Sequence, residues 1–194
     1  HVENITKVFG LPCVVAINVF PTDTPAELNL IEQKCRELGV NVALSEVWAK
    51  GGEGGEALAK EVLRLCETKS ECRFCYDVND SIPDKLNAIA KKIYHADGVD
   101  LTGPAKKQLK LLTDLHFDKL PICMAKTQYS FSDDAALLGA PNGFRITVKN
   151  LKVNAGAGFL IAQAGDIMTM PGLPKVPAAD KIDIDESGKI TGLF

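Results

Sequence analysis

CVVAINVFPTDTPAE, at residues 13–27, joins a buried strand to the start of a helix. Its first five residues form a continuous apolar run, which is typical of a strand buried on both faces, as in a parallel sheet. Thr24 then has the side chain of an N-cap, Pro25 suits the first helical position, and Glu27 stands where the second residue of a capping box belongs. These residues therefore predict a β-strand followed directly by an α-helix.

The same alternation continues through the first half of the chain, whereas the second half is richer in strands. We expect helices over residues 1–9, 25–38, 53–67, 79–95 and 103–116. Strand patterns cover residues 40–47, 122–125, 144–149 and 159–162, with a terminal hairpin over 182–190. Strands that alternate with helices across short loops predict an α/β fold. We expect a parallel-sheet α/β lobe over residues 1–96, followed by a smaller α+β lobe over residues 97–194.

The composition is that of an ordinary globular protein. The 194 residues are 46% hydrophobic and 24% charged, which excludes a disordered chain. A formal net charge of -3 and a pI near 5.7 argue against binding to nucleic acid or to a membrane surface through bulk charge. The longest apolar run, Leu11–Val19, is too short to cross a bilayer. We therefore expect neither nucleic acid nor a membrane as a partner.

Six cysteines raise the question of disulfides or metal binding. Cys13, Cys35 and Cys66 fall in apolar periodic segments, so we expect them to be buried free thiols. Cys72 and Cys75 form a single Cys-x-x-Cys pair without the further ligands that a structural zinc site needs, and we predict no metal site. A thiol redox protein that uses Cys72 and Cys75 is an alternative function. The lack of a disulfide framework indicates a reducing, cytoplasmic location.

Two aromatic residues follow the first two predicted strands. Phe20 comes shortly after the strand that includes Ile17, and Trp48 comes after the strand over residues 40–47. If these strands are parallel neighbours, both rings leave the sheet at its carboxyl edge, where ligands bind in open α/β sheets. Two rings at that edge could clamp a flat ligand by stacking. The alternative places Phe20 in the core and Trp48 as a lid over the first helix.

A glycine-rich segment, Gly51–Gly55, follows Trp48. It lacks the Gly-Lys-Ser/Thr triplet of a P-loop and the Gly-x-Gly-x-x-Gly spacing of a dinucleotide fold. Its backbone N–H groups could face an anion at the start of the next helix, and a flexible active-site loop fits the pattern equally well. From residue types alone, the sequence thus predicts an α/β protein with an aromatic cleft.

A resemblance to a known family is carried by VVAIN (14–18), FPTDT (20–24), EVWAKGGEGG (46–55), AKTQYS (125–130), GDIMTMPGLP (165–174) and GLF (192–194). These segments resemble the formate–tetrahydrofolate ligases, also called formyltetrahydrofolate synthetases, and the likeness runs over essentially the whole chain. The proline-rich run MPGLP at 170–174 has an unusual composition, which makes the resemblance specific. The chain is similar to the C-terminal portion of these enzymes, and Gln128–Ser130 with Asp133 and Asp134 resembles the monofunctional bacterial type.

The resemblance implies part of an ATP-dependent ligase that forms 10-formyltetrahydrofolate from formate and tetrahydrofolate through formyl phosphate. It implies that Phe20 and Trp48 sandwich the pterin ring and that Leu44 lines the same pocket. Around them we expect pocket or loop residues at Pro21, Asp23, Glu46, Lys50, Gly51 and Gly52. ATP and magnesium are implied as cofactors of the full-length enzyme, and the first lobe would then be the end of a P-loop-NTPase-like domain.

The family's phosphate-binding loop with its Gly-Lys-Thr is expected in an earlier part of a longer chain, as are the basic residues that hold formyl phosphate. We find none of them in these 194 residues, so we expect no catalytic residue here and no formate activation by this chain alone. The implied partners are the missing N-terminal part and further copies in a homo-oligomer. A non-catalytic folding or oligomerisation module of the same enzyme is the competing prediction.

Overall fold

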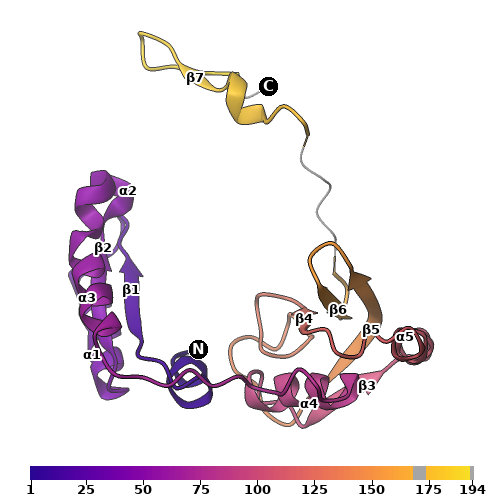
Figure 1. Ribbon diagram of the computed structural model, residues 1–194. Helices are drawn as coiled ribbons and strands as arrows, with labels where there is room; N and C mark the ends of the chain where they lie inside the picture. The colour runs from indigo at the N-terminus through magenta and orange to yellow at the C-terminus, as the bar shows by residue number, and fades with distance from the viewer. Residues whose placement is uncertain (168–173, 193–194) are drawn as a thin grey trace.

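The computed structural model describes residues 1–167 and 174–192. After a π-helical turn, η1 (Asn4–Val8), the chain forms a first unit around a parallel pair of strands (Figure 1). The elements of this unit are β1 (Val14–Asn18), α1 (Pro25–Glu37), β2 (Asn41–Ser45), α2 (Val47–Lys50), the 3-10 turn η2 (Gly51–Gly55) and α3 (Glu56–Cys66). Residues 67–81 contain no helix or strand and lead on to the second unit.

The second unit surrounds a mixed sheet. Its elements are α4 (Ile82–Lys92), β3 (Gly98–Leu101), α5 (Gly103–Asp114), β4 (Ile122–Ala125), β5 (Arg145–Asn154) and β6 (Phe159–Ala164). The strand order is β3-β5-β6-β4, in which β3 and β5 are parallel, β4 and β6 are parallel, and β5 and β6 are antiparallel. A mixed α/β architecture with parallel β-α units confirms the predicted fold class.

A short 3-10 helix and a hairpin follow the second sheet. They are η3 (Ala178–Lys181), β7 (Asp183–Ile184) and β8 (Ile190–Thr191). The hairpin confirms the turn expected over residues 182–190. Residues 168–173 and 193–194, which hold most of the proline-rich run and the chain end, lie outside the described residues. No helix in the described part of the chain is both long and apolar enough to cross a membrane.

Local signals account for both ends of α1. The Thr24 hydroxyl accepts the N–H of Glu27 at 3.3 Å, while the Glu27 carboxylate accepts the N–H of Thr24 at 2.9 Å. The predicted capping box is therefore present, with Pro25 in the first turn. Gly39 follows the helix with φ of 70°, a left-handed conformation that glycine adopts without strain.

Some boundaries differ from the sequence-based expectation. The strand expected over residues 40–47 ends at Ser45, because Val47 already begins the one-turn helix α2. The helix expected from residue 53 begins at Glu56, because the glycines before it form the 3-10 turn η2. The elements predicted from the sequence do not include the strand β3.

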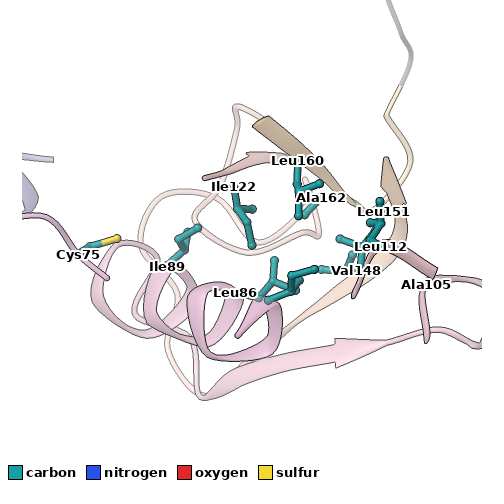
Figure 2. Packing of buried hydrophobic residues seen from close by; sticks show 11 residues of the cluster. Cys75, Leu86, Ile89, Ala105, Leu112, Ile122, Val148, Leu151, Leu160 and Ala162 are labelled. Carbon is teal, nitrogen blue, oxygen red and sulfur yellow. The ribbon is translucent and has the colours of Figure 1, made fainter. Parts of the chain in front are cut away.

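The main hydrophobic core lies in the second unit. Figure 2 shows Leu86 and Ile89 on α4 pointing toward the sheet, where Ile122 and Leu160 belong to the same buried cluster. This cluster takes no residue from the range 14–66, all of which is described. The division of the chain between residues 96 and 97 stays a prediction, and α4 packs across it.

Candidate functional site

The carboxyl ends of β1 and β2 form one edge of the first sheet. The strands are parallel neighbours and end with Asn18 opposite Ser45. Phe20 and Trp48 follow them, and the two ring centroids lie 6.0 Å apart with the ring planes tilted by 50°. Phe20 is 41% exposed and Trp48 is 65% exposed, so the alternative that buries Phe20 in the core is wrong. The structure brings both rings to one sheet edge, and their role in binding stays a prediction.

A closed turn holds the backbone of Phe20. The N–H of Asp23 donates to the Phe20 carbonyl at 3.0 Å, and the N–H of Phe20 donates to the Asp23 carboxylate oxygen Oδ2 at 2.8 Å. Pro21 stands between them with the fixed φ that suits the second position of a turn. On the strand side, the N–H of Val19 donates to the Ser45 carbonyl at 2.9 Å. The backbone at Phe20 is thus tied both to the sheet and to its own turn.

Trp48 lies on the helix α2. The N–H groups of Ala49 and Lys50 donate to the Glu46 carbonyl at 3.0 and 2.9 Å, and the Glu46 N–H donates to the Gly54 carbonyl at 3.0 Å. A Cβ on Gly54 would lie 2.5 Å from the Glu46 carbonyl carbon and oxygen. This contact is too short for any side chain, so only glycine fits at this position. The glycine-rich segment therefore packs against the start of the helix that carries Trp48.

Four of the other predicted pocket residues line one of two cavities. Leu44, Glu46 and Lys50 line a cavity of about 880 Å³, together with charged side chains of α1 and α3. The Lys50 ammonium pairs with the Glu46 carboxylate at 2.7 Å, so these two charges largely cancel. Asp23 lines a smaller cavity of about 340 Å³ between the carboxyl end of β1 and the helix α1, together with Asn18. The structure thus groups Leu44, Glu46 and Lys50, and it places Asp23 on the Phe20 side.

Gly51 and Gly52 lie on the open side of the turn after α2. A Cβ at either position would meet no atom within 4 Å. Gly51 has φ of 60°, which favours glycine at this position, whereas Gly52 has no such requirement. These two glycines leave the surface next to α2 uncovered.

A polar cavity of about 840 Å³ opens where β4 ends in the second unit. Lys126 lines it, and the Lys126 ammonium donates to the carbonyls of Thr127, at 2.8 Å, and Ser130. Burial lowers the pKa of Lys126, and the ammonium lies 4.9 Å from the centroid of the Tyr94 ring. The sequence indicates this segment only through the family resemblance of residues 125–130. The one residue-level signal was an apolar strand that ends in polar residues.

The cysteines differ in exposure from what their patterns indicate. Cys35 is buried as expected, Cys13 is half-buried, and Cys66 is exposed because it ends α3. Cys72 is exposed, whereas Cys75 is buried, and burial raises the pKa of the Cys75 thiol. A raised thiol pKa disfavours the thiolate that redox exchange needs. Within residues 1–167 and 174–192, no group of three or more His, Cys, Asp or Glu side chains could hold a metal ion.

The sequence of this chain was compared with models of known protein families. The model of the family described as formate–tetrahydrofolate ligase matches residues 1–194, which is the whole chain. The match includes both strands of the first sheet and the aromatic residues that follow them. This chain therefore belongs to the formate–tetrahydrofolate ligase family.

Proposed function

We propose that the chain is the C-terminal portion of a monofunctional, bacterial-type formate–tetrahydrofolate ligase and that it supplies the pterin-binding surface. The observation that carries this proposal is the Phe20–Trp48 pair, 6.0 Å apart at the carboxyl edge of a parallel strand pair. Parallel sheets bind ligands at this edge, and aromatic rings bind flat heterocycles by stacking. Leu44, an exposed apolar residue of β2, lines the cavity that Glu46 and Lys50 also line.

The other predicted residues shape this surface and take no part in bond making. Pro21 and Asp23 form the turn before α1, and Glu46 and Lys50 form an ion pair across α2. A pterin held between two rings presents its amine to the formyl group in one orientation. Such placement lowers an activation barrier by up to about 7–11 kcal/mol in the best cases.

The glycine-rich turn η2 does not fit the phosphate groups of ATP. The glycine-rich turn η2 is the segment nearest in composition to a phosphate cradle, but the Lys50 ammonium beside it is already paired with Glu46. Glu53 within the turn adds a negative charge that repels phosphate. We therefore assign ATP, magnesium and formyl phosphate, which family membership implies for the full enzyme, to residues outside this chain. We expect the chain alone to form no 10-formyltetrahydrofolate from formate and ATP.

Trp48 allows a direct test, because it is the only tryptophan. We expect tetrahydrofolate to quench its fluorescence saturably, after correction for ligand absorption. Phe20→Ala removes one stacking surface, and it should weaken binding about tenfold. Phe74→Ala is the matched control, since Phe74 is 86% exposed and lies outside the ring pair. The control should bind like the wild type.

A folding or oligomerisation module is the second candidate function. It is favoured by the exposed apolar side chains of Leu30 and Leu38 near or on α1 and of Leu63 on α3, which a partner surface would cover. If the folded wild-type chain shows no quenching by tetrahydrofolate, folate binding by this chain is wrong and the module becomes the better proposal. Sedimentation velocity over a range of protein concentrations would then measure self-association.

A further inference from the structure

The aromatic pair is too closely spaced to hold a third ring. Favourable contacts between carbon atoms lie at about 3.5–4.0 Å, so a ring between two others needs about 7–8 Å between the outer rings. The centroids of Phe20 and Trp48 are 6.0 Å apart, and the planes are tilted by 50°. A flat ligand can enter only if at least one of the two rings moves.

The two rings differ in how firmly the chain holds them. Phe20 lies between the last hydrogen bond of the sheet and the capping box at Thr24, and its own turn is closed by Asp23. Trp48 lies on a single turn of helix, which Gly54 holds at its start at Glu46, but the Trp48 side chain is the more exposed of the two, at 65% against 41%. Trp48 is therefore the ring with more freedom to move.

Asp23 provides the side-chain bond in the turn at Phe20. Its carboxylate oxygen accepts the Phe20 N–H at 2.8 Å, which is a hydrogen bond to a charged acceptor. Without this bond the turn keeps one backbone hydrogen bond, from the Asp23 N–H to the Phe20 carbonyl. The carboxylate thus adds the second of two bonds that fix the direction in which Phe20 leaves the sheet.

We propose that Asp23 is a positioning residue whose hydrogen bond makes Phe20 the fixed half of the aromatic pair and Trp48 the moving half. The consequence for ligand binding rests on the proposed role of these rings with pterin. The fixed geometry of Phe20 does not depend on that role. The inference can therefore be tested both without ligand and with it.

The ligand-free test uses the exposure of Trp48 to acrylamide in the 194-residue chain. Asp23→Ala should raise the quenching constant and shift the emission to longer wavelength, because Phe20 no longer stays beside the indole. Asp23→Asn keeps an acceptor oxygen at the same place and should restore the wild-type values. Glu27→Ala is the matched control: it breaks the neighbouring capping box but makes no bond to Phe20. Circular dichroism confirms that each variant is folded.

The test with ligand measures the dissociation constant for tetrahydrofolate. We expect Asp23→Ala to weaken binding about tenfold, with Asp23→Asn and Glu27→Ala close to wild type. Loss of thermal stability alone would affect Glu27→Ala as well, so it cannot produce this pattern.

The two tests separate the two proposals. If Asp23→Ala leaves both acrylamide quenching and emission unchanged, or if Asp23→Asn behaves like Asp23→Ala, the positioning role is wrong. If the wild-type chain binds no tetrahydrofolate while Asp23→Ala still exposes Trp48, the positioning role stands and the proposed pterin function fails.

Discussion

At the scale of single residues, Gly54 is the most tightly packed glycine near the aromatic pair. A Cβ there would lie 2.5 Å from the carbonyl carbon and oxygen of Glu46. We predict that Gly54→Ala displaces α2, costs about 1–3 kcal/mol of unfolding free energy and changes the emission of Trp48. Gly52→Ala is the control, because a Cβ at Gly52 meets no atom within 4 Å. Urea unfolding followed by Trp48 fluorescence compares them, and equal effects of the two variants would contradict the prediction.

Lys85 on α4 is a fully buried charge. Its ammonium donates to the carbonyls of Asp118 at 2.7 Å and Leu120 at 3.0 Å. Lys85→Met leaves both carbonyls without this donor, and we expect a loss of about 1–3 kcal/mol of unfolding free energy. Lys91→Met changes an exposed lysine of the same helix and should stay within about 0.5 kcal/mol of wild type.

The Lys85 effect should also depend on pH. Burial lowers the pKa of Lys85 below its ordinary value of 10.5, so the unfolded chain holds this proton more tightly than the folded chain. The free energy of unfolding of the wild type, relative to that of Lys85→Met, should therefore increase with pH. The increase should occur between the lowered pKa of Lys85 in the folded chain and its value of 10.5 in the unfolded chain. Denaturant unfolding of both proteins over this range measures the difference. A difference that falls with rising pH would show that the lysine is not desolvated.

At the scale of elements, the sequence predicted the structures whose causes are local. The signals for α1 lie within one turn, in Thr24, Pro25 and Glu27, and the helix starts where they place it. The sequence does not predict the strand β3 because its partner β5 lies far along the chain, and because its four residues are too few to establish an alternating pattern. The helix α2 was missed because Val47 and Trp48 are residues that favour strands.

In the candidate site, too, the position of the rings could be predicted from the sequence, whereas their spacing could not. Phe20 and Trp48 could be placed at one edge because each follows a strand, and the parallel pairing of those strands follows from the strand–helix–strand pattern. The 6.0 Å between the rings could not be predicted, because it depends on the turn at Asp23 and on the close approach at Gly54. Both depend on contacts in the folded structure, which the order of residues along the chain does not predict.

At the scale of the whole molecule, the unit from β1 to α3 connects to the rest of the chain through two adjoining segments. The Phe9 carbonyl accepts the Arg73 N–H at 3.0 Å, and the Arg73 guanidinium donates to the Lys7 carbonyl at 3.1 Å. A Cβ on Gly10 would lie 2.6 Å from the carbonyl oxygen of Glu71, so the segments run very close together. The main buried cluster lies on one side of this connection and takes no residue from 14–66.

This arrangement predicts that the two units unfold separately. Trp48 reports on the first unit, while the tyrosines, at positions 76, 94 and 129, all lie outside it. Leu86→Ala empties a fully buried position of the main cluster, and we expect it to cost the second unit about 2–5 kcal/mol. The tyrosine absorbance transition should move to lower urea, while the Trp48 fluorescence transition stays in place.

Ile17→Ala supplies the reciprocal test, because Ile17 is a buried residue of β1 in the first unit. It should lower the Trp48 transition and leave the tyrosine transition unchanged. Because cavity formation destabilises only the cooperative unit that contains it, opposite responses in the two variants require two units. If both optical signals shift together in either variant, the chain unfolds as one unit and the adjoining segments couple its halves.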